Sequence, residues 1–264
     1  MTHRSVNKSL GYAIFLVSVL ALTSRPAFAQ QCGDVPDHAA LTNALDGAVD
    51  VGGTANGGLG NNMWATVVNR DGIVCAVTFT GGDRDDQWPG SRVISAQKAN
   101  TANAFSLALF ALSTANLYSA VQPGGSLFGL QESNPVNVAV AYAGDAQFYG
   151  TAKDPMFGGK IGGVNVFGGG LALYNAAGAL VGAVGVSGDT SCTDHIVAWK
   201  TRHALNFDNV PNGVAGGTDN IIFDIRGSNG NFASKSGFGH PECGFGEAPI
   251  ATALPKTHPT GAAQ

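Results

Sequence analysis

The chain has 264 residues, of which 12% are charged, 44% are hydrophobic and 38 are glycine. The charged share is about half of the ~25% that is usual in globular domains, yet the hydrophobic share is too high for a disordered protein. The formal net charge is −4 and no basic run offsets it. The composition therefore argues against a protein that binds nucleic acid or an anionic membrane surface.

Residues 1–29 are expected to be a signal peptide. A basic start is followed by an apolar run of 13 residues, 10–22, and by a small-x-small cleavage sequence at 27–29. Thirteen residues are fewer than the about 20 that a helix needs to span a bilayer. The mature chain would begin at Gln30 with 11 basic and 18 acidic residues, a net charge of −7. We therefore expect an exported protein, periplasmic or secreted, without a membrane span.

After the signal peptide the sequence predicts an amphipathic helix over 37–51, a hairpin of strands 63–68 and 73–80, and a long helix over 94–110. A short helix from Ser113 and a half-buried strand over 136–142 are expected next, followed by a long loop over 144–162 that serves as a lid or an oligomer contact. A second hairpin and a last helix capped by Thr193 or Asp194 complete the order.

The second hairpin carries the most informative pattern of the chain. Two apolar runs, 171–174 and 180–186, flank a turn, which predicts a β-hairpin. Gly182 and Gly185 fall inside the second strand, and missing side chains there indicate that something packs close to the backbone.

This order of elements predicts one α+β domain, an antiparallel sheet of about five strands flanked by helices. We expect the domain to occupy 30–205. Residues 206–264 are rich in Gly, Pro and Asn and contain one strand candidate, 221–225. They are expected to form an irregular C-terminal extension that packs on the domain.

Two sequence blocks resemble a known family. The first contains Ser95, Lys98-Ala99, Thr101-Ala102 and Phe105, and the second contains Gly169-Gly170, the glycine-spaced strand end 182–188 and Asp194. With the first hairpin, they resemble the GlcG/HbpS-like family of haem-binding or haem-degrading proteins over residues 37–121 and 163–205. The sequence departs from the family pattern where Leu171-Ala172 replaces the usual Pro after the glycine pair.

The resemblance implies an exported haem-binding protein, with haem as its cofactor and weak haem degradation as a further expectation. The implied pocket lies between the long helix and the second hairpin, where backbone N–H groups at a helix start suit a carboxylate or a haem propionate. The ligand-binding residues expected there are Ser95, Lys98, Thr101, Gly169, Gly170, Ser187, Gly188 and Asp194.

His195 is the expected haem-iron ligand; the alternative is a solvated residue near a helix start. Lys98 and Thr101 share one helix face, and the alternative for Lys98 is a lysine that snorkels from a helix surface. On the pocket hypothesis, Lys98→Ala and His195→Ala each weaken ligand binding and leave the melting temperature nearly unchanged.

Two further functions stay open. One is a binding protein or enzyme for a small organic acid such as glycolate, held by Lys98, Thr101 and the start of the last helix. The other is a structural protein that assembles through a glycine-rich surface. A homo-oligomer is expected in any case. The sequence around Ser187 departs from a G-x-S-x-G elbow at its fifth position, and no catalytic acid or base is identified, so the sequence does not decide whether the protein is an enzyme.

All four cysteines lie in the exported part, and no Cys-x-x-Cys pair occurs. Two structural disulfides are therefore favoured over a zinc or thiol-redox site. Of the three connectivities we favour Cys192–Cys243 with Cys32–Cys75, because Cys192 precedes the last helix and Cys243 lies in a tail that must pack back. The other two connectivities stay open.

Overall fold

A computed structural model describes Met1 and residues 31–228 and 231–261 of the chain. The expected signal peptide, apart from Met1, lies outside the described residues. No helix in the described part is long and apolar enough to cross a membrane.

The main sheet has four strands, β1 (Trp64–Asn69), β2 (Val74–Phe79), β3 (Gly170–Tyr174) and β4 (Leu180–Ser187), in the order β2-β1-β4-β3. Each neighbouring pair is antiparallel. Both predicted hairpins and the predicted α+β class are thereby confirmed.

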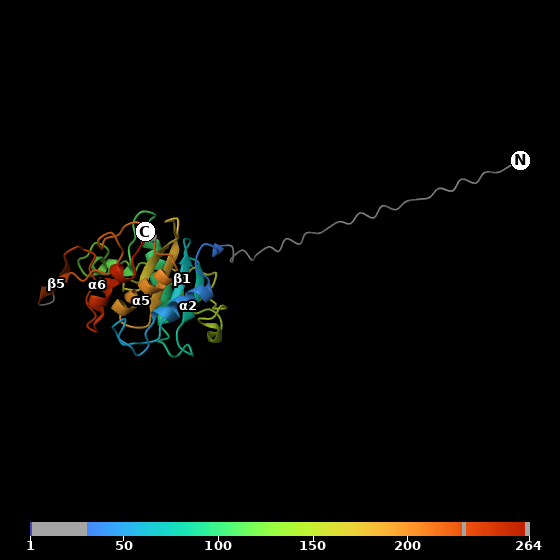
Figure 1. The fold of residues 1–264 in the computed structure, drawn as a ribbon, viewed down its shortest axis with the longest axis horizontal. Helices are drawn as coiled ribbons and strands as arrows, with labels where there is room; N and C mark the ends of the chain where they lie inside the picture. Colours follow the sequence, from blue (N-terminus) through green and yellow to red (C-terminus); the bar gives the residue numbers. More distant parts are fainter. Residues whose placement is uncertain (2–30, 229–230, 262–264) are drawn as a thin grey trace.

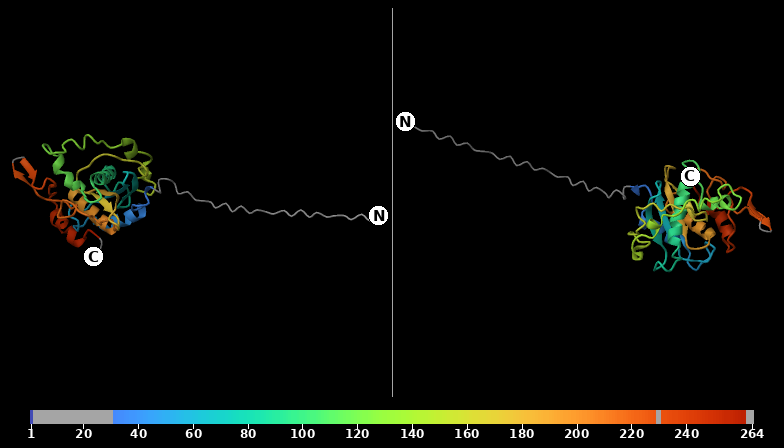
Figure 2. Two further views of the ribbon diagram at one scale, coloured as in Figure 1. Left: turned by 90° about the horizontal axis from the view of Figure 1, so that it is seen from above. Right: turned by 180° about the vertical axis from the view of Figure 1, so that it is seen from behind.

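Helices cover both faces of this sheet (Figures 1 and 2). Helices α2 (His38–Ala48), α5 (Ser191–Ala204) and α6 (Glu247–Thr257) lie on one side, and α3 (Ser91–Phe105) lies on the other. Strand β1 shows the alternation: Ala65 and Val67 join the core of α2 and α5, whereas Trp64 and Val68 join the core of α3. Because both faces are covered, the sheet is buried on both sides.

The strand predicted over 136–142 is wrong. This segment contains a single helical turn, α4 (Val138–Ala141), and the Asn137 side chain accepts hydrogen bonds from the N–H groups of Ala139 and Val140. An asparagine that caps a helix in this way competes with extended structure. The alternation of Val and Ala was a misleading signal because these residues fit either conformation.

Other elements also differ from the prediction: α2 ends at Ala48 rather than at 51, and α3 begins at Ser91 rather than at 94. Helix α3 ends at Phe105, the short helix after Ser113 is a pair of 3-10 turns, η1 (Thr114–Leu117) and η2 (Ser119–Val121), and the loop over 144–162 holds the 3-10 turn η3 (Ala146–Phe148). Neither Thr193 nor Asp194 caps α5. The cap is Thr190, whose side chain accepts from the Thr193 N–H.

The C-terminal segment is more regular than its composition indicates. It holds α6 and a small hairpin, β5 (Ile225–Ser228) and β6 (Asn231–Ser234), which projects from the body in Figures 1 and 2. The strand candidate 221–225 therefore overlaps β5 only at its last residue. Ala251 and Leu254 of α6 are buried in the same core as Ile196 and Trp199 of α5.

The two favoured disulfides are present. Cys32 is bonded to Cys75, which lies on β2, and Cys192 at the start of α5 is bonded to Cys243. The first disulfide joins the segment before α2 to the sheet, and the second joins the C-terminal segment to α5.

Candidate functional site

Gly170 of β3 and Gly185 of β4 lie directly against the backbone of α3. A Cβ atom on Gly185 would lie 2.0 Å from the Ser95 carbonyl oxygen, and one on Gly170 would lie 2.4 Å from the Lys98 carbonyl oxygen. The prediction that something packs close to Gly182 and Gly185 is confirmed: the element is α3 for Gly185 and the end of β1 for Gly182, where a Cβ would lie 2.1 Å from the Val68 carbonyl oxygen. Helix α3 therefore occupies the space that the expected pocket would need at Gly170 and Gly185.

Lys98 and Asp194 form a buried ion pair across this contact. Lys98 Nζ lies 2.6 Å from Asp194 Oδ2 and donates to the Val186 carbonyl oxygen at 3.1 Å. Both side chains are almost fully buried. Gly169 is at the same point, with φ +119, and a Cβ there would lie 3.0 Å from Lys98 Nζ. Only glycine suits this position, because it combines a left-handed φ with this close approach.

Burial governs the protonation of this pair. Desolvation raises the pKa of Asp194 to about 6 and lowers the pKa of Lys98, and the attraction between the two groups opposes both shifts. A pKa of about 6 leaves Asp194 ionised at pH 7, where Lys98 compensates its charge. An ion pair in such a position holds two elements together as long as both partners are present.

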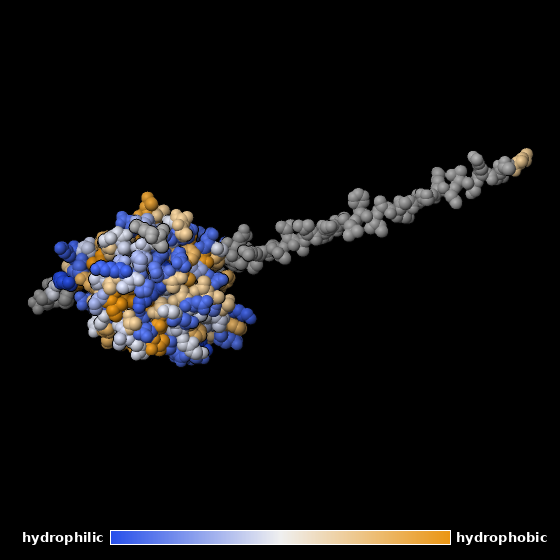
Figure 3. All heavy atoms as spheres, viewed as in Figure 1, coloured by the Kyte–Doolittle hydropathy of each residue, from blue (hydrophilic) through white to orange (hydrophobic). Residues whose placement is uncertain are grey.

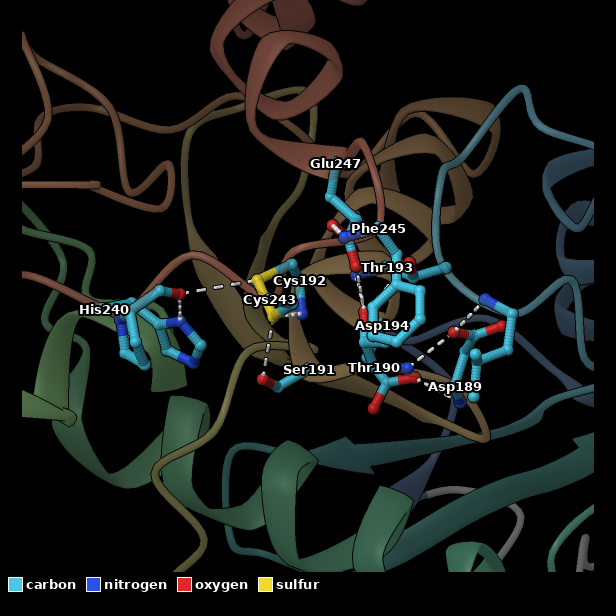
Figure 4. Close-up of a disulfide and its surroundings, with 12 residues drawn as sticks. Asp189, Thr190, Ser191, Cys192, Thr193, Asp194, His240, Cys243, Phe245 and Glu247 are labelled. Carbon is cyan, nitrogen blue, oxygen red and sulfur yellow. Dashed lines mark hydrogen bonds between the residues drawn. A yellow bond between two sulfur atoms is a disulfide. The ribbon is translucent and has the colours of Figure 1, made fainter.

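The start of α5 is occupied by the protein's own groups (Figure 4). The N–H groups of Gly188 and Asp189 donate to Asp194 Oδ1 at 3.1 and 3.0 Å. The Cys192 N–H donates to Cys243 Sγ at 3.2 Å. The Thr190 hydroxyl donates to Glu247 Oε1 at 2.6 Å, so the C-terminal segment reaches this helix end. A ligand carboxylate would have to displace these partners.

The remaining hydroxyl groups expected at the site are also engaged within the protein. Ser95 Oγ donates to the Arg92 carbonyl oxygen at 2.8 Å, and Thr101 Oγ1 donates to the Gln97 carbonyl oxygen at 2.7 Å. Ser187 Oγ lies 3.3 Å from Ser91 Oγ. The structure thus brings Lys98, Gly169, Gly188 and Asp194 into one cluster, whereas Thr101 is engaged elsewhere along α3.

His195 is fully buried rather than solvated. Its Nε2 lies 3.0 Å from Asn220 Oδ1 and 3.1 Å from the Ile221 N–H nitrogen, and its Nδ1 has no hydrogen-bond partner among the described residues. Burial lowers the pKa of His195 to about 4, so the ring is neutral at pH 7. A neutral imidazole is the form that binds iron, but Asn220 and Ile221 of the C-terminal segment cover this one.

A cavity of about 430 Å³ lies elsewhere, between the start of α2, strand β2 and the segment 151–157. Its apolar lining residues include Val35, Pro36, Val77 and Phe157, and the Cys32–Cys75 disulfide also borders it. One histidine lines it, His38, whose Nε2 lies 2.9 Å from the Gly150 carbonyl oxygen.

That contact determines which nitrogen of His38 carries the proton. A carbonyl oxygen only accepts, so Nε2 carries the hydrogen and the neutral ring keeps a lone pair on Nδ1. Sequence reasoning missed His38, because a lone histidine at a helix start has no local signal. Its partner is 112 residues away in the chain.

The chain belongs to the HbpS-like family. The family model described as "Haem degrading protein HbpS-like" matches residues 44–202, which include both glycine-rich strands, Lys98 and Asp194. The resemblance seen in the sequence is thereby confirmed. No curated protein sequence matches the chain.

Several solved structures are similar to the chain. A complex of PduOC with haem has a TM-score of 0.43 and 23% identity, covering 64% of this chain and 91% of that one. The Klebsiella pneumoniae protein ORFY has a TM-score of 0.40 and 25% identity, covering 76% and 97%. A double mutant of HbpS from Streptomyces reticuli has a TM-score of 0.41 and 16% identity, covering 75% and 99%.

Proposed function

We propose that the mature protein is an exported haem-binding protein. The observation that carries this proposal is the family match over residues 44–202. A small organic acid ranks second, because the N–H groups that it would need at the start of α5 already donate to protein atoms.

The cluster around Lys98 does not fit a haem, because its side chains are buried and paired with each other. His195 is 0% exposed, and the C-terminal segment covers the helix start beside it. Haem iron could reach His195 only if that segment moved away.

The cavity beside α2 fits a haem better. Pockets for small molecules and cofactors are mostly apolar, occupy about 300–1,000 Å³ and contain few polar groups. A histidine that binds a metal usually donates its second ring N–H to a carbonyl or carboxylate, and His38 does so toward Gly150. We therefore assign His38 as the iron ligand, and His195 is the alternative.

Bound haem would supply the redox-active iron that degradation requires. The carboxylate in this cavity, Asp154, is held by Arg92 through contacts of 2.9 and 2.5 Å, and it accepts N–H bonds from Gly150 and Met156. These partners engage both oxygens of Asp154, so this carboxylate is not free to act on a bound haem. We therefore propose binding with slow degradation, which ascorbate-driven loss of the Soret band would measure.

Hemin titration of the purified mature protein tests the proposal. A Soret shift at micromolar hemin is expected, and its absence would refute haem binding. His38→Ala should alter the bound spectrum and lower the affinity more than about tenfold, or about 1.4 kcal/mol, while His195→Ala should not. The matched control is His258→Ala, which lies outside the cavity lining. The reverse pattern would assign the iron to His195.

Export and assembly complete the proposal. Two disulfides suit an oxidising compartment, and export predicts a mature N-terminus at Gln30 in the periplasm or medium. For assembly, four exposed apolar residues lie near one another in the chain, Val138, Tyr142, Phe148 and Phe157. The face in Figure 3 carries only small apolar patches among polar atoms. We propose that the segment 138–157 mediates a homo-oligomer.

A further inference from the structure

Cys192, His240 and Cys243 lie close enough together to hold a metal ion. One ring nitrogen of His240 and the two Sγ atoms are all within 4.8 Å of one another, and this is the only such group of three or more potential ligands among the described residues. Figure 4 shows His240 beside the Cys192–Cys243 disulfide at the start of α5. In the disulfide form the sulfur atoms are bonded to each other, so they cannot act as thiolate ligands.

His240 is held as a ligand would be. Its Nδ1 lies 2.7 Å from the Pro241 carbonyl oxygen, so Nδ1 carries the hydrogen and donates. Its Nε2 then has a free lone pair, and this atom is buried without a partner among the described residues. The residue is 1% exposed. A buried lone pair without a donor is costly, and a metal ion would satisfy it.

Cys243 is placed where a thiolate is stabilised. Its Sγ accepts the Cys192 N–H at 3.2 Å and lies 3.5 Å from Ser191 Oγ, at the N-terminal end of the 14-residue helix α5. A helix N-terminus favours the ionised form of a cysteine.

We propose that reduction of the Cys192–Cys243 disulfide creates a zinc site made of the two thiolates and the His240 Nε2. A dithiol supplies two electrons and two protons, giving two thiols in the protein and a disulfide in the reductant. Zinc binding then releases the two thiol protons to solvent. Three protein ligands leave one tetrahedral position for water. The site is independent of the proposed haem cavity, which lies beside the other disulfide.

Zinc titration of the mature protein tests this inference. The protein is reduced with dithiothreitol and freed of reductant without oxygen. We expect one zinc per chain and release of two protons, and the oxidised protein should bind none. The Cys192→Ser/Cys243→Ser variant should bind none when reduced. The matched Cys32→Ser/Cys75→Ser variant, which lacks the other disulfide, should still bind one.

His240→Ala should weaken zinc binding more than about 100-fold, beyond the 10- to 100-fold typical of losing an outer-shell partner. This variant also removes a buried ring and could lose binding by unfolding, so a second measurement uses the protein with His240 intact. Zinc X-ray absorption of that reduced, zinc-loaded protein should show two sulfur ligands and at least one nitrogen ligand. A reduced protein that binds no zinc, binds it without sulfur ligands, or unfolds before binding would overturn the inference. Equal binding by the oxidised protein would overturn it as well.

Discussion

Lys98→Met tests whether the ion pair with Asp194 holds α3 against the glycine-rich strands. The substitution keeps a long apolar stem and removes the ammonium group, which leaves Asp194 buried without its counter-ion. Removing one partner of a buried pair typically costs about 3–5 kcal/mol. For a chain of this length each kcal/mol lowers the melting temperature by about 2–4 °C, so we expect a loss of about 6–20 °C. This replaces the sequence-based expectation of an unchanged melting temperature on loss of the Lys98 ammonium.

Urea denaturation of the disulfide-intact mature protein, followed by circular dichroism, is the assay. The control is Lys153→Met, which removes an exposed lysine and should change stability by less than about 0.5 kcal/mol. The double variant Lys98→Met/Asp194→Asn should recover part of the loss, because the uncompensated charge is then gone. A Lys98→Met protein within about 1 kcal/mol of the original would refute the structural role of the pair.

Three further predictions follow from the described residues. Gly185→Ala should cost about 3 kcal/mol or more, because its Cβ would lie 2.0 Å from a backbone oxygen of α3; Gly47→Ala, with open space around it, should be harmless, and equal melting temperatures would contradict this packing. Burial lowers the pKa values of His195 and His240 to about 4 from 6.5, so the unfolded chain binds more protons between pH 4 and 6.5. The free energy of unfolding should therefore be highest above pH 6.5 and fall toward pH 4 by about 1.4 kcal/mol per pKa unit and histidine, partly offset by the raised pKa of Asp194. His195→Gln should flatten this dependence of the unfolding free energy on pH, measured by urea denaturation at several pH values. An unchanged dependence would count against the role of His195. Tyr142→Asp should lower the oligomer mass in light scattering without changing the melting temperature, and an unchanged mass would move the contact elsewhere.

Local patterns were sufficient for the elements whose signal is local. Both hairpins follow from alternation and turn residues, and the glycines of β4 correctly indicated a close backbone approach. Helix α6 was missed because its prolines, Pro249 and Pro255, indicate irregular structure. Pro249 lies in the first turn, where a proline is tolerated, and Pro255 lies near the end.

The candidate site could be predicted only in part, because burial depends on contacts between distant segments. The Lys98–Asp194 pair joins residues 96 positions apart, and His195 is covered by Asn220 and Ile221. The sequence grouped Lys98 and Asp194 in one expected site and predicted a C-terminal segment that packs back, but it gave no sign that Lys98 and Asp194 pair with each other or that this segment covers His195. The alternative of a solvated His195 is wrong for the same reason.

The C-terminal segment changes what the family's glycine-rich block can do in this chain. The family match ends at residue 202, and residues beyond it supply Cys243 and Glu247 at the start of α5. Leu254 also joins the central core, so the segment is part of the fold and does not merely cover it. A helix start whose N–H groups already have protein partners does not attract a ligand anion at low cost. The glycine-rich block therefore serves here to bring α3 onto the sheet.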